Sequence, residues 1–523
     1  MIDIYKSQPE LSREDMETIV MDELKHPYYD VCINRAKVMN TWYQAEHDEY
    51  LYTNNILFSE KTYIIKQSSV ESERDYQRKL DRMKLFPLEQ KFLSAQQRIY
   101  DENNVNREYG GDRDFWAWKE ENFDGESDPA TEFYRDKVLY VKEVLGFGAV
   151  VTDIMVDGQG NTVFDPQGNV VPYNVVLRPH EIFHFGFRQG VLTHLVTRQL
   201  TFSIKNEKIY RWTAYTPSKV YMWEQKNSQK EFVAQIDNPF GEVPATLLKG
   251  QPDANSSFQI GKPRRYSLKG LYLSASELFY DLKQGAELFG HPIPVMHEGI
   301  LKSMSGIADD ETYESDRIVE SVGMTIVIPD DMQVPSTMLY QADMQGLQYL
   351  RDVIFNDLMG LIFLLAQVRD KSVVKSNVSG NAKKLDNIEE QGLLATTASD
   401  MEKVENEVLK RMARVRGEDY AEFTVTYSKH YDLSSAQEIW SDISEGMQYH
   451  GLTPAALKYL MHEYLRKRSA PQDWIDKIMT ELDEHGMPQT ASELKDLVDI
   501  LPPEELERRA NIGIELSNTE NVN

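Results

Sequence analysis

The sequence predicts an α+β fold, and two observations carry that prediction. Over most of the chain, apolar residues recur at every third or fourth position, which is the spacing of amphipathic helices. Between about residues 147 and 250, the pattern changes to runs of β-branched and aromatic residues separated by glycine-containing turns, which is typical of antiparallel strands. A chain of 523 residues, 41% of them hydrophobic, is long enough for about three packing units with buried cores.

The chain is strongly acidic. It has 57 Lys and Arg residues against 84 Asp and Glu residues, so its formal net charge is -27. Such a surface repels phosphate groups and anionic lipids. The charge therefore argues against a protein that coats nucleic acid or membranes, unless a local basic cluster provides contact.

Cysteine usage and the first residues limit the cellular compartment. The only cysteine is Cys32, so one copy of the chain has no internal disulfide and no cysteine-based metal site. A reducing compartment fits that count. The first residues lack the basic and apolar regions of a signal peptide, and the longest apolar stretch, 353–368, contains Asn356 and Asp357. We therefore expect neither a signal peptide nor a membrane span.

The first 125 residues are predicted to be helical and charged. Their clearest helical periodicity runs from Glu71 to Asn103 and is broken at Pro87. A further helix is expected from Glu132 to Leu145, where Gly146 ends it.

After this helix, the rest of the region 126–250 is predicted to form one antiparallel sheet. Gly158-Gln-Gly and Pro166-Gln-Gly-Asn lie between strand-like runs and have the composition of hairpin turns. The expected strands then follow one another as a meander: Val175–Phe187, Leu192–Ile204, Tyr210–Tyr215 and Val220–Glu224.

Two long helices are expected to flank a short irregular region. The first has apolar residues at helical spacing from Leu268 to Gly290, and residues 293–338 follow with one strand signal at Met324–Ile328. The second helix, Gln341–Gln367, would be about 40 Å long at 1.5 Å per residue. Its apolar stripe consists of Leu347, Leu350, Ile354, Leu358, Ile362 and Leu365.

A polar stretch at 369–384 connects the second helix to a third, expected at Leu385–Arg416. One strand is expected at Phe423–Tyr427, and residues 434–523 are predicted to be entirely helical. Thr453-Pro454 and the pair Thr490 and Glu493 have the composition of helix starts in this last region. The polar stretch contains one acid and five basic residues: Arg369, Lys371, Lys375, Lys383 and Lys384.

His180-Glu-Ile-Phe-His184 matches the H-E-x-x-H pattern, in which two histidines one helical turn apart bind zinc and the glutamate polarises a water. That chemistry needs a helix, whereas Pro179 and the aromatic and β-branched residues of the motif favour extended chain. On a strand the two histidines would lie about 13 Å apart and could not share one metal, with or without His194 as a third ligand. We interpret the match as a coincidence and expect no metal. A zinc hydrolase that uses His180, Glu181 and His184 is the alternative from another functional class.

No other motif marks a catalytic site. The phosphate-binding pattern G-x-x-x-x-G-K-[ST] and the nucleophile pattern G-x-S-x-G do not occur. Gly146-Phe-Gly148 and Gly158-Gln-Gly160 do not open a helix after a strand, as dinucleotide binding requires, and are interpreted as turn glycines. We predict a protein that is not an enzyme, uses no cofactor and is passive in any ATP-driven process.

The basic stretch 369–384 is the first candidate binding site, although a solvated surface loop is the simpler interpretation. Two points favour a function: positive charge gathers here in an acidic chain, and long helices hold the stretch at both ends. A polyanion is a suitable partner, because polar side chains such as Asn377 can add hydrogen bonds to phosphate without reading bases. Stacking aromatics are absent, which argues against a single-strand site of the usual kind.

The acidic stretch 309–316 is the second candidate. It does not satisfy the calcium-loop pattern, so metal binding is not expected. A solvated face is the simpler interpretation, and docking to a basic partner is the functional one. The residues concerned are Asp309, Asp310, Glu311 and Glu314.

The order of these elements resembles the portal proteins of tailed double-stranded DNA bacteriophages. In that family a helical and sheet-bearing wing leads into a stem helix, a small clip, a second stem helix, a tunnel loop, a long wing helix, a returning strand and a helical crown. The resemblance covers about residues 70–510 and rests on architecture, because the family has no invariant catalytic motif. It is closest in Val175-Val-Leu-Arg-Pro-His-Glu-Ile-Phe-His-Phe, in Asp343–Leu365 with the loop that follows, and in Ser434–Leu465.

The resemblance implies a division of the chain into seven parts. The basic residues of the tunnel loop, with Asn377, would face DNA, and the four acidic residues would belong to the clip, which docks partners. The first 70 residues have no counterpart. The parts are a wing at 1–267, a stem helix at 268–292, the clip at 293–338, a second stem helix at 339–368, the tunnel loop at 369–384, a long wing helix and returning strand at 385–433, and a crown at 434–523.

The resemblance also implies a ring of about twelve copies at one capsid vertex, assembled in the host cytoplasm, through which a separate ATPase drives DNA. Implied partners are double-stranded DNA, the terminase large subunit, a head-completion or tail adaptor protein, and the major capsid and scaffolding proteins, with no membrane. An acidic bore with sparse basic contacts would let a duplex slide. A multidomain adaptor of another large assembly would share the charge and the helices, and is a further alternative.

Overall fold

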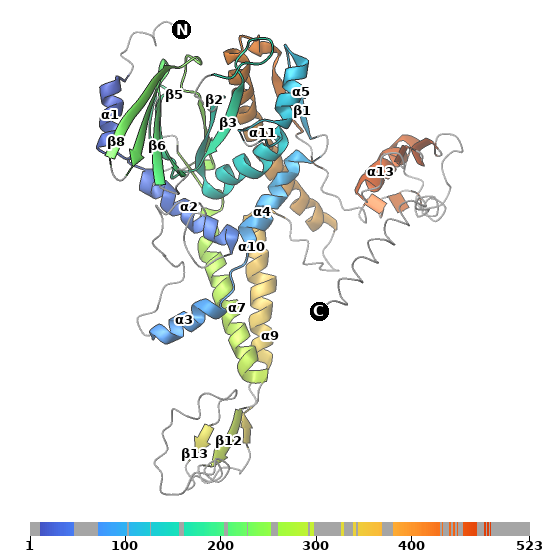
Figure 1. Ribbon diagram of the computed structural model, residues 1–523. Helices are drawn as coiled ribbons and strands as arrows, with labels where there is room; N and C mark the ends of the chain where they lie inside the picture. Colours follow the sequence, from blue (N-terminus) through green and yellow to red (C-terminus); the bar gives the residue numbers. More distant parts are fainter. Residues whose placement is uncertain are drawn as a thin grey trace, which may run out of the picture. The chain divides into compact units, whose positions relative to one another are not determined.

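A computed structural model of the protein confirms the α+β fold, with many helices and mainly antiparallel sheets (Figure 1). The chain forms two compact units, Met1–Tyr431 and Asp432–Asn523. Among the described residues, no helix combines the length and the apolar composition needed to cross a bilayer. The structure describes residues 11–45, 72–101, 104–125, 127–155, 162–202, 208–226, 229–252, 260–290, 293–297, 326–328, 338–340, 344–368, 380–428, 431, 439–440, 443–444, 447, 453–467, 475–476, 478–480 and 482.

The larger sheet of the first unit has five antiparallel strands in the order β4-β5-β6-β7-β8. Helices α1 (Arg13–Met21) and α2 (Tyr29–Gln44) cover one of its faces (Figure 1). A capping box starts α1, because Ser12 and Asp15 each accept the other's backbone N–H. The strands are β4 (Ile182–Arg188), β5 (Val191–Phe202), β6 (Lys208–Tyr215), β7 (Lys219–Lys226) and β8 (Gln229–Asp237). The core under the helices includes Met16, Val20, Ile33, Phe183, Val196, Trp212 and Trp223.

A second, three-stranded sheet in the order β3-β2-β9 packs on the opposite face of the five strands. The prediction of a single meander is therefore wrong. The expected strand Val175–Phe187 is divided by a turn, because the Arg178 N–H donates to Glu181 Oε2 at 2.7 Å and the Glu181 N–H donates back to the Arg178 carbonyl at 3.0 Å. The strands are β2 (Phe147–Ile154), β3 (Pro172–Leu177) and β9 (Ala245–Lys249), and the shared core includes Phe147, Ala149, Val151, Leu177, Ile182, Phe185 and Leu195.

The predicted helix before β2 is confirmed, and parts of it have the wide π turn: α6 (Ala130–Glu132), η4 (Phe133–Val138) and η5 (Val141–Leu145). Gly146 ends it in the left-handed region, at φ 81°, where an added Cβ would lie 2.0 Å from the Pro263 nitrogen. Only glycine fits there.

Helix α11 (Gly380–Val415) covers the outer face of the three-stranded sheet, where Asn174 Nδ2 lies 3.1 Å from Met412 Sδ. The predicted strand after it is confirmed as β15 (Thr424–Tyr427), which pairs antiparallel with β1 (Val105–Glu108). Because β1 lies in the region expected to be helical, that expectation is wrong there. Only one of its four residues is apolar, so pairing with β15 decides its structure.

The remaining elements of the first unit are short. The predicted break at Pro87 is confirmed, since α3 (Glu73–Arg82) ends before it and α4 (Leu88–Gln96) starts after it. The others are η3 (Gln97–Tyr100), α5 (Arg113–Glu121), β10 (Gln251–Pro252), β11 (Gly261–Lys262), η6 (Tyr266–Leu268) and η9 (Tyr420–Glu422).

The two predicted long helices around residues 293–338 are confirmed. Helix α7 (Lys269–Gly290) lies beside a second helical rod, residues 344–365, and the rings of Phe279 and Phe355 are 6.3 Å apart (Figure 1). Between the two helices in sequence lies a small sheet in the order β13-β12-β14. The rod consists of α9 (Met344–Asp352), η8 (Val353–Leu358) and α10 (Met359–Leu365), and the sheet of β12 (Ile293–His297), β13 (Ile326–Ile328) and β14 (Met338–Tyr340).

The described part of the second unit centres on helix α13 (Pro454–Lys467). Its start is as predicted, since Thr453 Oγ1 accepts the Ala456 N–H at 3.2 Å. The predicted helix start at Thr490 and Glu493 lies outside the described residues. The core of this unit consists of Ile439, Ile443, Leu457, Met461, Tyr464, Leu465, Ile475, Ile478 and Leu482.

Candidate functional site

The predicted binding residues fall mostly outside the described part of the chain. The backbone at Lys383 and Lys384 is described and is helical, because α11 begins at Gly380 rather than at residue 385. Ala382 and the two lysines are good helix formers, which explains the longer helix. Outside the described residues lie Arg369, Lys371, Lys375 and Asn377 of the basic stretch, and Asp309, Asp310, Glu311 and Glu314 of the acidic one.

The ends of the remaining basic stretch, residues 369–379, are fixed by described helices. Before it, α10 closes with Gln367 in the left-handed region at φ 57°. The Val368 N–H donates to the Phe363 carbonyl at 3.2 Å, which satisfies one of the last carbonyls of the helix. After it, α11 starts at Gly380. In sequence, the stretch therefore lies between the rod 344–365 and the long helix α11.

A buried ionic network lies at the start of α7 and connects it to α4. Arg265, just before α7, donates from Nε to Glu89 Oε2 at 3.0 Å and from Nη1 to Gln96 Oε1 at 2.9 Å, and both acceptors belong to α4. The Tyr272 hydroxyl of α7 donates to Glu89 Oε1 at 2.7 Å. All four side chains are buried, so α7 is attached to α4 by buried, charge-assisted hydrogen bonds.

The same network extends to α11. Gln96 Nε2 donates to Glu143 Oε2 at 3.0 Å and to Thr397 Oγ1 of α11 at 3.2 Å. Glu143 is fully buried, and burial alone would raise its pKa, but the adjacent Lys142 and Arg264 cations hold the pKa below its ordinary value. We call this set the root network; it comprises Glu89, Gln96, Lys142, Glu143, Arg264, Arg265, Tyr272 and Thr397.

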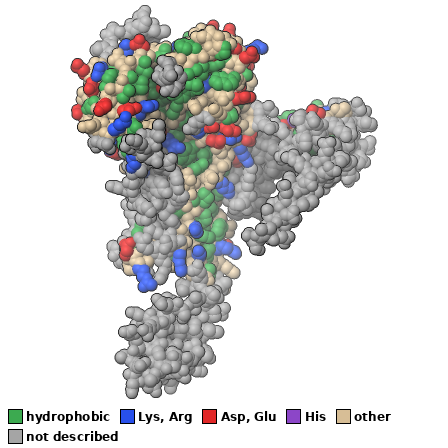
Figure 2. All heavy atoms as spheres, viewed as in Figure 1, with side chains coloured by type: hydrophobic (Ala, Val, Ile, Leu, Met, Phe, Trp, Pro, Cys, Tyr) green, Lys and Arg blue, Asp and Glu red, His purple; other side chains and the backbone are tan. Residues whose placement is uncertain are grey.

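Large apolar side chains are exposed on the rod 344–365. Of the sixteen such side chains exposed in the described part of the chain, five belong to this rod. Figure 2 shows apolar side chains at the surface along this region. Contiguous exposed apolar surface is typical of sites that contact another protein, a membrane or a ligand. The five are Tyr349 (72% exposed), Phe355 (41%), Leu361 (42%), Leu364 (55%) and Leu365 (52%).

The sequence predicted that the H-E-x-x-H residues would not lie on a helix, and the structure confirms this. His180 and Glu181 belong to the turn between β3 and β4, and His184 lies in β4. His184 Nδ1 is 2.9 Å from His194 Nε2 of β5, a hydrogen-bond distance in which one ring donates to the other. Among the described residues, no group of three or more His, Cys, Asp or Glu side chains is arranged to hold a metal ion.

His26, which no sequence pattern marked, completes a cluster of three histidines. Its ring stacks on Phe185 with centroids 3.9 Å apart, and its centroid is 5.8 Å from that of His184. Burial, followed by the neighbouring His184 ring, lowers the pKa of both His26 and His194 to about 4. Both imidazoles are therefore neutral near pH 7.

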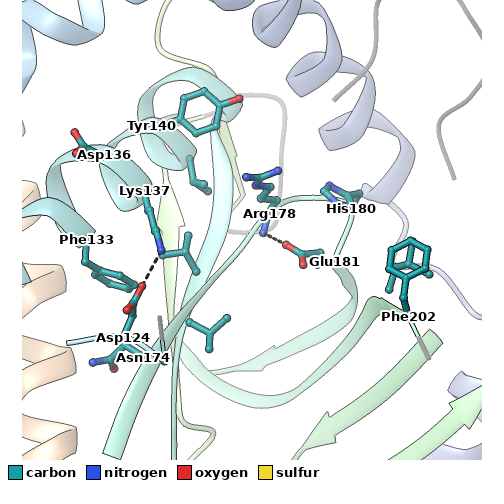
Figure 3. Close-up of a pocket in the computed structure, with 15 residues that line it drawn as sticks. Asp124, Phe133, Asp136, Lys137, Tyr140, Asn174, Arg178, His180, Glu181 and Phe202 are labelled. Atoms are coloured by element: carbon teal, nitrogen blue, oxygen red, sulfur yellow. Dashed lines mark hydrogen bonds and ion pairs between the residues drawn. The ribbon is translucent and has the colours of Figure 1, made fainter. Parts of the chain in front are cut away.

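A cavity of about 570 Å³ lies next to the turn that carries His180 and Glu181 (Figure 3). Helix residues 133–141, the edge of β3 and the end of β5 line it. Lys137 Nζ is already paired with Asp124 at 2.7 Å and with Asp128 at 2.9 Å, so it does not offer an unpaired cation to a phosphate. The described lining contains no Ser, Thr or Cys, and hence no nucleophile of those types.

The similarity of this chain to known proteins is weak. No family model matches it, and no curated protein matches it. Among solved structures, a chain from the virion of a native gene transfer agent particle is similar over 69% of this chain and 89% of its own length, with 10% sequence identity and a TM-score of 0.33. A TM-score of that size carries no argument, so the function of this chain is inferred from its own architecture and charge.

Proposed function

We propose that the chain is the subunit of a virion ring that forms a passive channel for double-stranded DNA at one capsid vertex, as in the portal proteins that it resembles. The observation that carries the proposal is the helix pair formed by α7 and the rod 344–365. The pair leaves a sheet-bearing wing, has a small sheet between its helices in sequence, and continues through a basic stretch into the long helix α11 (Figure 1). This is the order of stem, clip, second stem helix, tunnel loop and wing helix.

Exposed apolar side chains support the ring. A pair of helices can bury only the stripe that each turns toward the other, and the rod also exposes five large apolar residues. Neighbouring copies in a ring would cover them by a head-to-tail contact that closes on itself.

The charge distribution supports a channel rather than a DNA clamp. At -27 per copy, a ring repels the phosphate backbone over most of its surface. Contact is then limited to the few basic residues at 369–384, so the duplex is guided without being held. The root network would keep the channel helices attached to the wing while DNA moves.

The remaining partners follow from the same proposal. The acidic residues at 309–314 would dock the terminase large subunit during packaging and a head-completion or tail adaptor afterwards. Capsid and scaffolding proteins would contact the ring while the particle is assembled, and no enzymatic activity, metal or cofactor is proposed for the chain itself.

The experiment replaces four lysines of the basic stretch, Lys371, Lys375, Lys383 and Lys384, by Ala. We expect rings to assemble as before and the DNA content per particle to fall, measured by cryo-electron microscopy of the particles. The matched control removes four exposed lysines from other elements and should package normally: Lys208, Lys226, Lys403 and Lys410. Equal DNA content in both variants would remove the basic stretch from the mechanism.

A further inference from the structure

Strand β3 is the outer strand of the three-stranded sheet. It pairs with β2 on one side, and among the described strands no other pairs with it. The cavity of about 570 Å³ lies along its other side (Figure 3). The edge strand of a sheet presents N–H and carbonyl groups that can pair with an added chain. The cavity can therefore offer main-chain groups to a ligand as well as side chains.

Alternate residues of β3 direct their main-chain groups toward the cavity. The Met155 N–H donates to the Val171 carbonyl at 2.9 Å in the register of β2 and β3, so the odd-numbered residues of β3 face β2. Arg178, directly after β3, faces the other way. Its N–H donates to Glu181 Oε2 at 2.7 Å, and its carbonyl accepts the Glu181 N–H at 3.0 Å. The even-numbered residues of β3 therefore face away from β2.

Val176 is the one residue of this edge whose main chain is open to the cavity, as far as the described residues show. At one end of the cavity, Asn174 forms an isolated parallel bridge with Asp124. At the other end, the turn to Glu181 satisfies Arg178. No described residue forms a hydrogen bond with the N–H or the carbonyl of Val176. One donor and one acceptor thus remain between two closed ends.

Apolar side chains form much of the remaining lining. They are Phe133 and Val141 of the helix before β2, and Leu200 and Phe202 at the end of β5. The Phe202 side chain is 47% exposed, so its ring is open to contact with a ligand. Charged residues of both signs line the cavity, which does not select an ion. A volume of about 570 Å³ lies within the range of about 300–1,000 Å³ that is usual for ligand sites.

We propose that this cavity binds a short extended segment of another protein chain, which pairs with Val176. One residue of an antiparallel strand offers one N–H and one carbonyl on the same side, and these match the two open groups of Val176. The closed ends at Asn174 and Arg178 limit the pairing to that one residue. Apolar side chains of the segment would then contact Leu200 and Phe202. The inference does not depend on the proposed function.

Val176→Pro tests the main-chain pairing. Proline removes the N–H that faces the cavity and leaves the bonds between β3 and β2 in place, and it is tolerated on an edge strand where the N–H points outward. Val175→Pro is the matched control, because it removes an N–H that faces β2. We expect Val175→Pro to lower the melting temperature and Val176→Pro to leave it near the wild-type value.

The binding probe is a fluorescein-labelled, amidated pentapeptide, Thr-Val-Phe-Val-Thr, whose β-branched residues favour an extended chain. Fluorescence anisotropy with the full-length protein should show saturable binding. Loss of one hydrogen bond in the Val176→Pro variant should weaken it about fivefold.

A second probe has the same sequence with N-methyl groups on its three interior residues, so these residues cannot donate to the Val176 carbonyl. The wild-type chain should bind it about fivefold more weakly than the first probe. This comparison uses the wild-type chain alone and stays decisive if the proline variant does not fold. Absence of saturable binding of the first probe, or equal binding of both probes, would overturn the proposal.

Discussion

His26, His184 and His194 show how neighbouring side chains set the charge of single residues in the first unit. Gly186 makes their arrangement possible, because a Cβ at that position would lie 2.4 Å from His194 Cε1. The three rings therefore pack tightly in the neutral form, which forms one hydrogen bond between His184 and His194. Protonation of both imidazoles of that pair would place two cations in contact.

Acid should destabilise the first unit of the chain. The pKa of His26 and of His194 is about 4 in the folded chain and about 6.5 in an unfolded one, so the unfolded chain binds more protons between these values. The contribution of the two neutral histidines to the free energy of unfolding is complete above pH 6.5 and is lost as the pH falls toward 4. At pH 5 each residue should lower the free energy of unfolding by about 2 kcal/mol relative to pH 7.

Urea unfolding at pH 7 and pH 5 measures this effect. His194→Gln should reduce the difference between the two pH values, and His462→Gln on the exposed side of α13 is the matched control that should leave it unchanged. A wild-type chain equally stable at both pH values would show that the histidine cluster is not neutral in the folded state.

Structural roles that depend on residues close in sequence could be predicted. Contacts between residues far apart in sequence could not. Pro87, Gly146 and Thr453 act locally, and each ends or starts a helix where expected. The root network gives no such signal, because Gln96 and Thr397 are 301 positions apart. His184 was singled out for a zinc motif, yet its partners His194 and His26 come from neighbouring elements.

At the scale of elements, the root network joins α4, η5, α7 and α11. Arg265→Ala should lower the free energy of unfolding by about 3–5 kcal/mol, because it leaves the buried Glu89 carboxylate without its cation. Arg351→Ala is the matched control and should cost about 0–1 kcal/mol, since its pair with Asp352 is 61% and 54% exposed. Chemical denaturation monitored by tryptophan fluorescence measures both, and a loss below about 1 kcal/mol for Arg265→Ala would mean that the network does not hold the helices.

Element types were predicted more accurately than element partners. Periodicity located both long helices and the strand β15, because it depends on one face of one element. It did not separate the two sheets, whose strands are equally rich in apolar residues. It missed β1, whose structure depends on β15. It also placed Leu365 on the buried stripe, whereas Leu365 is 52% exposed, because the π segment η8 adds one residue before it.

At the scale of the whole molecule, charge and architecture give the same account. The chain is acidic and has a pair of long helices, with exposed apolar residues on one helix and a basic stretch after it. A monomer would leave these apolar residues in contact with water. In a ring, the apolar residues would be buried between copies and the basic stretches would meet around one axis. The order of elements in the sequence suggested a ring. The exposed apolar residues that support a ring could be identified only from the three-dimensional structure.

The formation of a closed ring is the central claim, and electron microscopy of the purified full-length protein tests it most directly. The account predicts particles with a central channel and rotational symmetry of about twelve copies, with a mass to match by mass photometry. The measurement is made at physiological salt and at protein concentrations well above the detection limit. Monomers or dimers without a channel under these conditions would contradict the account.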